Sequence, residues 1–125
     1  MTIQEAITKV DRQRPNHVKD EDKIAWLSEL DGMIHKEIIM SHDHTEDQEA
    51  YDGYDGNTDL NMSLLAPFPY DDIYIHWLIS NIDMVNLEID KYNNDRTLFN
   101  NAYDTLSDYW TRTHMPKQKT RELRL

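Results

Sequence analysis

Hydrophobic residues recur three or four positions apart over most of the chain, the spacing that places them on one face of an α-helix. The first such stretch begins at Thr2 and Glu5, whose spacing predicts a capping box at the start of a short helix. Pro15 ends it, because proline disfavours helical backbone in the preceding residue. A second helix is expected from about Glu21 to about Met40, and Gly32 within it suggests the close approach of a neighbouring helix. Its apolar face consists of Ile24, Leu27, Leu30, Ile34 and Ile38.

Two more helices are predicted after Pro69. The first extends from Asp71 to about Tyr92 and ends at Asn93-Asn94, a pair suited to the left-handed residue that often terminates a helix. The second ends at Met115-Pro116. Because few residues join them, we expect an antiparallel helical hairpin. The predicted fold class is therefore all-α: a small helical bundle of three long helices and a short N-terminal one, in a single domain over residues 1–116.

Residues 42–61, called here the acidic segment, have a different composition, with seven acidic residues and no Lys or Arg. The steps Asp52-Gly53 and Asp55-Gly56 favour turns. We therefore expect an excursion from the bundle, as a loop or a short β-hairpin anchored by Tyr51 and Tyr54. Residues 64–69 are expected to follow it as an extended apolar strap over the core. The seven acidic residues are Asp43, Glu46, Asp47, Glu49, Asp52, Asp55 and Asp59.

Composition excludes several classes of protein. The 125 residues include no cysteine, which rules out disulfides, thiolate catalysis and cysteine-ligated zinc or iron–sulfur sites. The formal charge of −11 argues against binding nucleic acid by phosphate neutralisation. No apolar run approaches the roughly 18 residues that cross a bilayer, and no signal peptide is evident, so we expect no membrane partner and a reducing compartment.

The charge is unevenly distributed along the chain. Residues 1–116 carry nine basic and twenty-three acidic residues, a net charge of −14, whereas residues 117–125 form a basic tail of net charge +3. Such a tail is commonly a frayed terminus, but in a self-assembling protein it can engage an acidic face of a neighbour. The basic residues of the tail are Lys117, Lys119, Arg121 and Arg124.

Two motifs raise the question of a metal site. His42-Asp43-His44, with His35 upstream, has ligand types that bind divalent metals, although a solvated helix end with polar residues is the favoured interpretation. Residues 55–59 match the first oxygen ligands of a calcium loop, but Leu60 and Ala66 replace the glycine and the closing glutamate. No phosphate loop, nucleophile elbow or dinucleotide fingerprint is present. We therefore predict no cofactor, no resident metal and no catalytic residues.

Three stretches of the chain carry a resemblance to a known class of protein. They are Trp26–Ile34, Gly53–Tyr74, and the segment from Tyr92 to Pro116 with its Tyr92-Asn93-Asn94 and Tyr109-Trp110-Thr111-Arg112-Thr113-His114 sequences. Together they resemble the head–tail connector (adaptor, or head-completion) proteins of tailed phages, encoded in prophages of Gram-positive bacteria.

The resemblance implies a structural subunit without enzymatic activity. It implies a homo-oligomeric ring that contacts the phage portal protein on one side and a tail-side completion protein on the other, while DNA passes through without specific binding. The protein would be made in the cytoplasm of the bacterial host and end at the head–tail junction of the virion. By position, the acidic segment and the basic tail would be the contact elements, and the face nearest the ring axis is expected to be acidic or neutral.

Two alternatives stay open at this stage. An acidic phage-encoded binding protein, such as a DNA mimic or regulator, fits the size and the charge. More remotely, a metal-dependent enzyme would use His42, His44 and the acids nearby.

Overall fold

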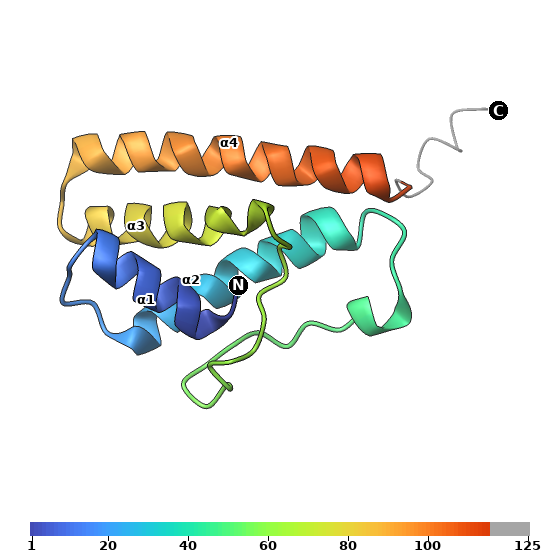
Figure 1. Cartoon of the computed structure of the whole chain (residues 1–125), viewed down its shortest axis with the longest axis horizontal. Coiled ribbons are helices and arrows are strands. Elements are labelled where there is room, and N and C mark those ends of the chain that lie inside the picture. Colours follow the sequence, from blue (N-terminus) through green and yellow to red (C-terminus); the bar gives the residue numbers. More distant parts are fainter. Residues whose placement is uncertain (116–125) are drawn as a thin grey trace.

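The computed structural model describes residues 1–115, and these form a small all-α protein, as predicted (Figure 1). Its four α-helices are α1 (Ile3–Gln13), α2 (Asp20–Ile34), α3 (Ile73–Val85) and α4 (Ile89–Thr113). Two short 3₁₀ turns, Glu46–Gln48 and Tyr70–Asp72, lie between α2 and α3. The described residues include no strand, only an isolated bridge between Thr2 and Ser63.

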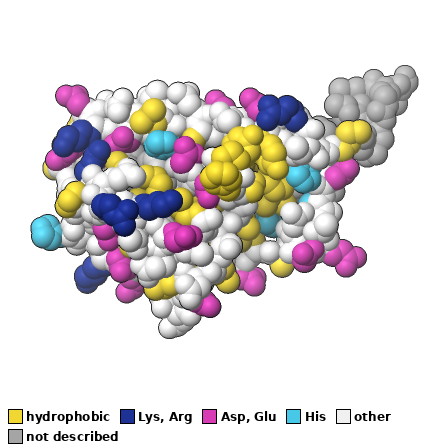
Figure 2. All heavy atoms as spheres, in the orientation of Figure 1, with side chains coloured by type: hydrophobic (Ala, Val, Ile, Leu, Met, Phe, Trp, Pro, Cys, Tyr) yellow, Lys and Arg dark blue, Asp and Glu magenta, His cyan; other side chains and the backbone are white. Residues whose placement is uncertain are grey.

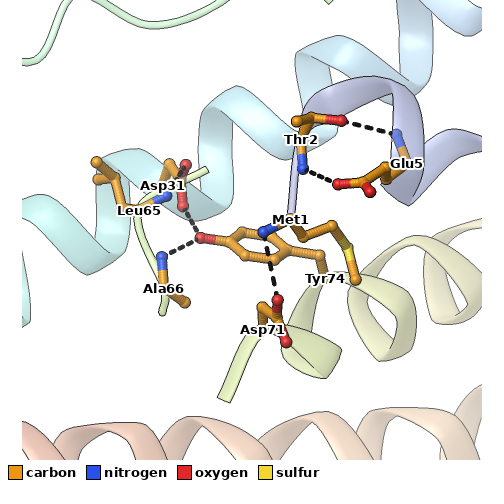
Figure 3. A network of polar contacts seen from close by, with 8 residues as sticks. All are labelled: Met1, Thr2, Glu5, Asp31, Leu65, Ala66, Asp71 and Tyr74. Atoms are coloured by element: carbon orange, nitrogen blue, oxygen red, sulfur yellow. Dashed lines mark hydrogen bonds and ion pairs between the residues drawn. The ribbon is translucent and has the colours of Figure 1, made fainter. Parts of the chain in front are cut away.

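Helix α1 begins as its sequence predicts. The Thr2 hydroxyl accepts a hydrogen bond of 3.1 Å from the Glu5 amide, and the Glu5 carboxylate accepts one of 2.8 Å from the Thr2 amide (Figure 3). The capping box satisfies two amides that have no partner within the helix. The helix then buries its apolar face, formed by Ile3, Ala6, Ile7 and Val10, against α2 and α3.

The long second helix changes geometry near its end. Regular α-helix stops at Ile34, and His35–Ile39 form a single π-helical turn in which the Met40 amide donates 2.9 Å to the His35 carbonyl. The helical extent expected up to about Met40 is therefore confirmed, with one wider turn that the periodicity did not predict. Such turns are rare and insert an additional residue into the helix.

Helices α3 and α4 form the predicted antiparallel hairpin, but the prediction placed its turn wrongly (Figure 1). Asn93 and Asn94 lie inside α4, and α3 ends at Val85. The turn is a Schellman motif: the Glu88 amide donates to the Asp83 carbonyl and Leu87 takes the left-handed position with φ of 57°. Glycine usually occupies that position, so Leu87 gave no stop signal and the apolar periodicity continued through the turn.

The core lies where α3 packs against the other three helices, and Trp77, Leu78 and Ile82 are buried there. The apolar strap is also present. It connects the acidic segment to α3 along the chain, and its residues Leu64 and Ala66 are buried. Phe68 differs from its neighbours and is 84% exposed. Figure 2 shows hydrophobic side chains gathered where the segment before α3 meets α4, and Tyr70 stacks on Tyr109 at 4.5 Å in this region.

Candidate interaction surface: the acidic segment

Two tyrosines attach the middle of the acidic segment to α2. The Tyr51 hydroxyl donates to the Ser28 carbonyl at 2.6 Å, and the Tyr54 amide donates to the Ser28 hydroxyl at 2.9 Å. The expected β-hairpin is therefore wrong, because both tyrosines anchor the chain to a helix and not to a second strand. The expected excursion is wrong for the same reason: the segment is a strap along α2, joined to it at Ser28 (Figure 1).

Two glycines lie at this contact, and only Gly53 is required to be glycine. Gly53 has φ of +80°, and a Cβ atom there would lie 2.9 Å from the Ser28 hydroxyl, so both backbone and space favour glycine. At Gly32 a Cβ atom would be 3.6 Å from the Tyr51 ring. The neighbour of Gly32 is thus a tyrosine of the acidic segment, and the expected neighbouring helix is not what contacts it.

Both ends of the segment are also held. At its start, the Asp43 amide donates 2.7 Å to the Met115 carbonyl, just after α4. At its end, the Leu60 and Met62 carbonyls accept hydrogen bonds from the first amides of α1, at 2.9 and 3.1 Å. These bonds satisfy amides that α1 cannot satisfy itself. The acidic segment therefore spans the distance between two helix ends with fixed attachments at both.

Beneath the segment lies a buried carboxylate that ties it to α3. Asp31 is fully buried, and its two oxygens accept hydrogen bonds of 2.5 Å from the Tyr74 and Tyr54 hydroxyls. The Leu65 amide donates to the same carboxylate at 3.1 Å, and the Ala66 amide donates to the Tyr74 hydroxyl at 2.7 Å (Figure 3). Three groups far apart in sequence thus converge on one acidic side chain, and the Ala66 amide joins them through the Tyr74 hydroxyl.

The environment of Asp31 shifts several pKa values. Burial raises the pKa of Asp31, although the hydrogen bonds from Tyr54, Tyr74 and Leu65 oppose that shift. Burial, followed by the charge of Asp31, raises the pKa of Tyr54 and of Tyr74 well above that of free tyrosine. Both hydroxyls therefore stay protonated and act as donors. Because Asp31 and Tyr74 are both fully buried, the cluster is a structural anchor for the acidic segment.

The sequence interpretation missed this anchor, although one signal was present. Asp31 lies four residues after Leu27 and three before Ile34, on the apolar face of α2. A carboxylate at such a position requires donors from elsewhere in the fold. The same reasoning applies to Lys23, which is 2% exposed and whose ammonium lies 2.6 Å from an Asp11 oxygen.

All seven acidic residues of the segment are exposed to solvent. None of them forms an ion pair within residues 1–115. Asp55 and Asp59 accept local bonds from the amides of Asn57 and Asn61, and bonds from Thr45 and from its own backbone amide lower the pKa of Asp47. The structure brings these acids onto one continuous strap, while the predicted basic contacts Lys117, Lys119, Arg121 and Arg124 lie outside the described residues.

The proposed metal ligands have other partners. His42 is buried, with Nδ1 2.7 Å from the Ile38 carbonyl and Nε2 3.0 Å from the Thr111 hydroxyl, so it links the end of α2 to α4. His35 contacts the Gln48 carbonyl and stacks on Tyr51, and His44 contacts the His42 carbonyl. Among residues 1–115, no three His, Asp or Glu side chains are grouped as a metal site.

None of the helices described here is both long and apolar enough to cross a membrane. Comparison of the chain with protein-family models, with curated proteins and with solved structures gives no match. The acidic segment presents fixed, exposed carboxylates that have no basic partner in the described part of the chain, so its interactions with other molecules would be mainly electrostatic.

Proposed function

We propose that the protein is a structural subunit of a phage head–tail connector, which forms a homo-oligomeric ring between the portal protein and the tail-side completion protein and has no enzymatic activity. The resemblance of the three sequence stretches supports this assignment. The observation that carries it is the acidic segment: seven exposed carboxylates on a strap held at both ends and in the middle.

Fixed attachment suits a surface that binds another protein. A mobile loop loses conformational entropy when it binds, whereas a segment already tied to α1, α2 and α4 is ordered before binding. Fixed charges also orient and accelerate the approach of a basic partner. An assembly protein that meets its partners in a set order benefits from both effects.

The acidic surface also suits a channel through which DNA moves. Carboxylates repel the phosphate backbone, so the DNA would pass without being held, whereas a basic lining would retain it. We therefore expect the purified full-length chain not to retard duplex DNA at low salt. Tight, salt-sensitive binding of duplex DNA would contradict the proposal.

The decisive experiment is electron microscopy of the protein, alone and mixed with a phage portal protein from the same genome, to look for rings. A variant with Glu46→Gln, Asp47→Asn and Glu49→Gln is expected to weaken ring or portal contact. A control with the same loss of charge, Asp90→Asn, Asp104→Asn and Asp108→Asn on α4, is expected to assemble as the unmodified protein does. Absence of rings under both conditions would overturn the connector assignment.

The rival class, an acidic DNA mimic or regulator, makes a different prediction. Such a protein would inhibit a DNA-binding enzyme, for example a restriction enzyme, in proportion to its concentration. Its carboxylates would need to follow the spacing of phosphates along an exposed element, whereas here they lie on an irregular strap. The metal-dependent alternative has no grouping of ligands to support it in residues 1–115.

A further inference from the structure

A second surface lies at the end of the molecule opposite the acidic segment's attachment to α4. There the α1–α2 connection, the first turns of α2 and the end of α3 enclose a cavity of about 300 Å³. Val18, Trp26 and Val85 contribute its apolar walls, and Asp22 lies at its edge. None of the residues that line it belongs to the acidic segment or to α4, and the α1–α2 connection lies far from the C-terminal end of α4 (Figure 1).

The surface beside this cavity is unusually apolar for an exposed turn. Val85 is 56% exposed and lines the cavity, and the Schellman turn that follows holds Leu87 at 77% and Ile89 at 49% exposure. Because Leu87 adopts a left-handed conformation, its side chain is displayed at a cost in backbone energy. Apolar side chains displayed together in this way mark a contact surface more often than isolated exposed ones do.

The basic tail has the chemistry that complements this surface. Its last residues, Arg121-Glu122-Leu123-Arg124-Leu125, alternate bulky apolar and charged side chains. The cavity offers Trp26 and Val85 to the leucines. The first turn of α2 offers three exposed acids to the two arginines: Asp20, Glu21 and Asp22. These acids outnumber Lys19, which also lines the cavity.

The tail of the same molecule is too short to reach this cavity. Helix α4 has 25 residues, so at about 1.5 Å per residue it separates the cavity end from Thr113 by roughly 37 Å. Leu123 and Leu125 follow Met115 by eight and ten residues, which span at most about 29 and 36 Å when fully extended. A tail that places its leucines in the cavity must therefore belong to a second copy of the chain.

We propose that residues 117–125 of one copy dock in the cavity formed by Val18, Trp26 and Val85 of the next copy. The contact is head-to-tail, because it joins two different surfaces. Each copy would bind one neighbour through its tail and the other neighbour through its cavity. Contacts of this type repeat from copy to copy and close into a ring when the rotation permits. That these contacts close into a ring rests on the proposed function, whereas the docking of the tail is tested separately.

The first test uses a synthetic peptide of residues 117–125 titrated into the full-length protein at low micromolar concentration. Trp26 is partly exposed while Trp77 and Trp110 are buried, so a change in tryptophan emission that disappears in Trp26→Phe reports the cavity. Val85→Asp is expected to weaken peptide binding about tenfold or more, because it places a desolvated charge against the leucines. Leu98→Asp, at an exposed apolar position in the middle of α4, is the matched control and is expected to bind as before.

A charge exchange provides the second test. Asp22→Arg is expected to weaken the peptide about fivefold, and a peptide with Arg124→Asp is expected to recover binding to that variant. No binding by the unmodified peptide, or equal binding by Val85→Asp, overturns the docking. The function is judged apart from this, by electron microscopy: rings formed by Val85→Asp would retain the connector assignment while removing this contact from it.

Discussion

Tyr74 and Asp31 share a hydrogen bond of 2.5 Å between Tyr74 Oη and Asp31 Oδ1, and both residues are completely buried. The pair joins α3 to α2 across the core. It also positions the apolar strap of residues 64–69, because the same tyrosine oxygen accepts a hydrogen bond from the Ala66 amide. A polar contact in this position is specific in direction and distance, whereas apolar packing tolerates small shifts. The position of residues 64–69, which follow the acidic segment, therefore depends on a fully buried tyrosine.

Tyr74→Phe is expected to lower the free energy of unfolding by about 2 to 3 kcal/mol, since it leaves the buried Asp31 Oδ1 and the Ala66 amide each without a partner. Tyr54→Phe removes a bond of equal length to the same carboxylate, but at a partly exposed position where water can replace it, so a loss of about 1 kcal/mol is expected. Urea unfolding followed by circular dichroism measures both. Equal losses of unfolding free energy in the two variants would contradict the prediction that the cost depends on burial.

Asp95 is expected to make stability depend on pH. Burial, and then the neighbouring Asp83, raises the pKa of Asp95 to about 6, against the pull of Arg14, whose guanidinium lies 3.5 Å away and also contacts Asp83. The folded state thus keeps a proton that the unfolded chain releases near pH 4, so this contribution is present at low pH and is lost as the pH rises to about 6.

Asp95→Asn should therefore match the unmodified protein near pH 4 and exceed its stability above pH 6 by about 2 kcal/mol. The difference between the two urea midpoints across pH 4 to 8 isolates this residue from other carboxylates. A variant that is less stable at neutral pH would mean that the ion pair with Arg14 outweighs the cost of burial.

Gly53→Ala is expected to destabilise the fold by about 1 to 2 kcal/mol, because the added Cβ meets Ser28 and the positive φ strains an L-residue. Gly56→Ala is the control in the second Asp-Gly step, where an added Cβ meets no atom within 4 Å. Thermal unfolding compares them. The Gly53 variant should also expose the segment between the two tyrosine anchors to limited proteolysis, and equal cleavage of both variants would argue against tight attachment at Ser28.

Lys23 and Asp11 are expected to respond unequally to substitution. Lys23 is 2% exposed, whereas the Asp11 side chain is 43% exposed. Asp11→Ala leaves a buried ammonium with only the distant Asp20 oxygen at 3.9 Å, which should cost about 2 to 3 kcal/mol. Lys23→Met keeps the apolar stem and leaves a carboxylate that water can solvate, so a loss below about 1 kcal/mol is expected. The reverse order in urea titrations would contradict this.

Local signals predicted local structure. The Thr2–Glu5 capping box, the periodicity of Ile24 to Ile38 and the hairpin of the last two helices all follow from residues close in sequence, and all are present. The predicted position of the hairpin turn was wrong because α3 ends at a left-handed leucine, Leu87, where a glycine or asparagine would have indicated the end of the helix.

Contacts between distant residues were beyond such reasoning. The Asp-Gly steps favour turns and so predict a hairpin that contains Tyr51 and Tyr54, but the tyrosine hydroxyls donate to acceptors on α2, 23 residues earlier. His42 has the composition of a metal ligand, yet its ring joins Ile38 to Thr111. In each case the side chain's partner depends on the packing of helices, which periodicity does not specify.

The hydrogen bond from the Asp43 amide to the Met115 carbonyl has a mechanical consequence. It lies where the described chain ends, beside the link between His42 and Thr111. Tension applied at Met115 is therefore shared between the last turn of α4 and the start of the acidic segment, and passes through the Tyr51 and Tyr54 attachments into α2.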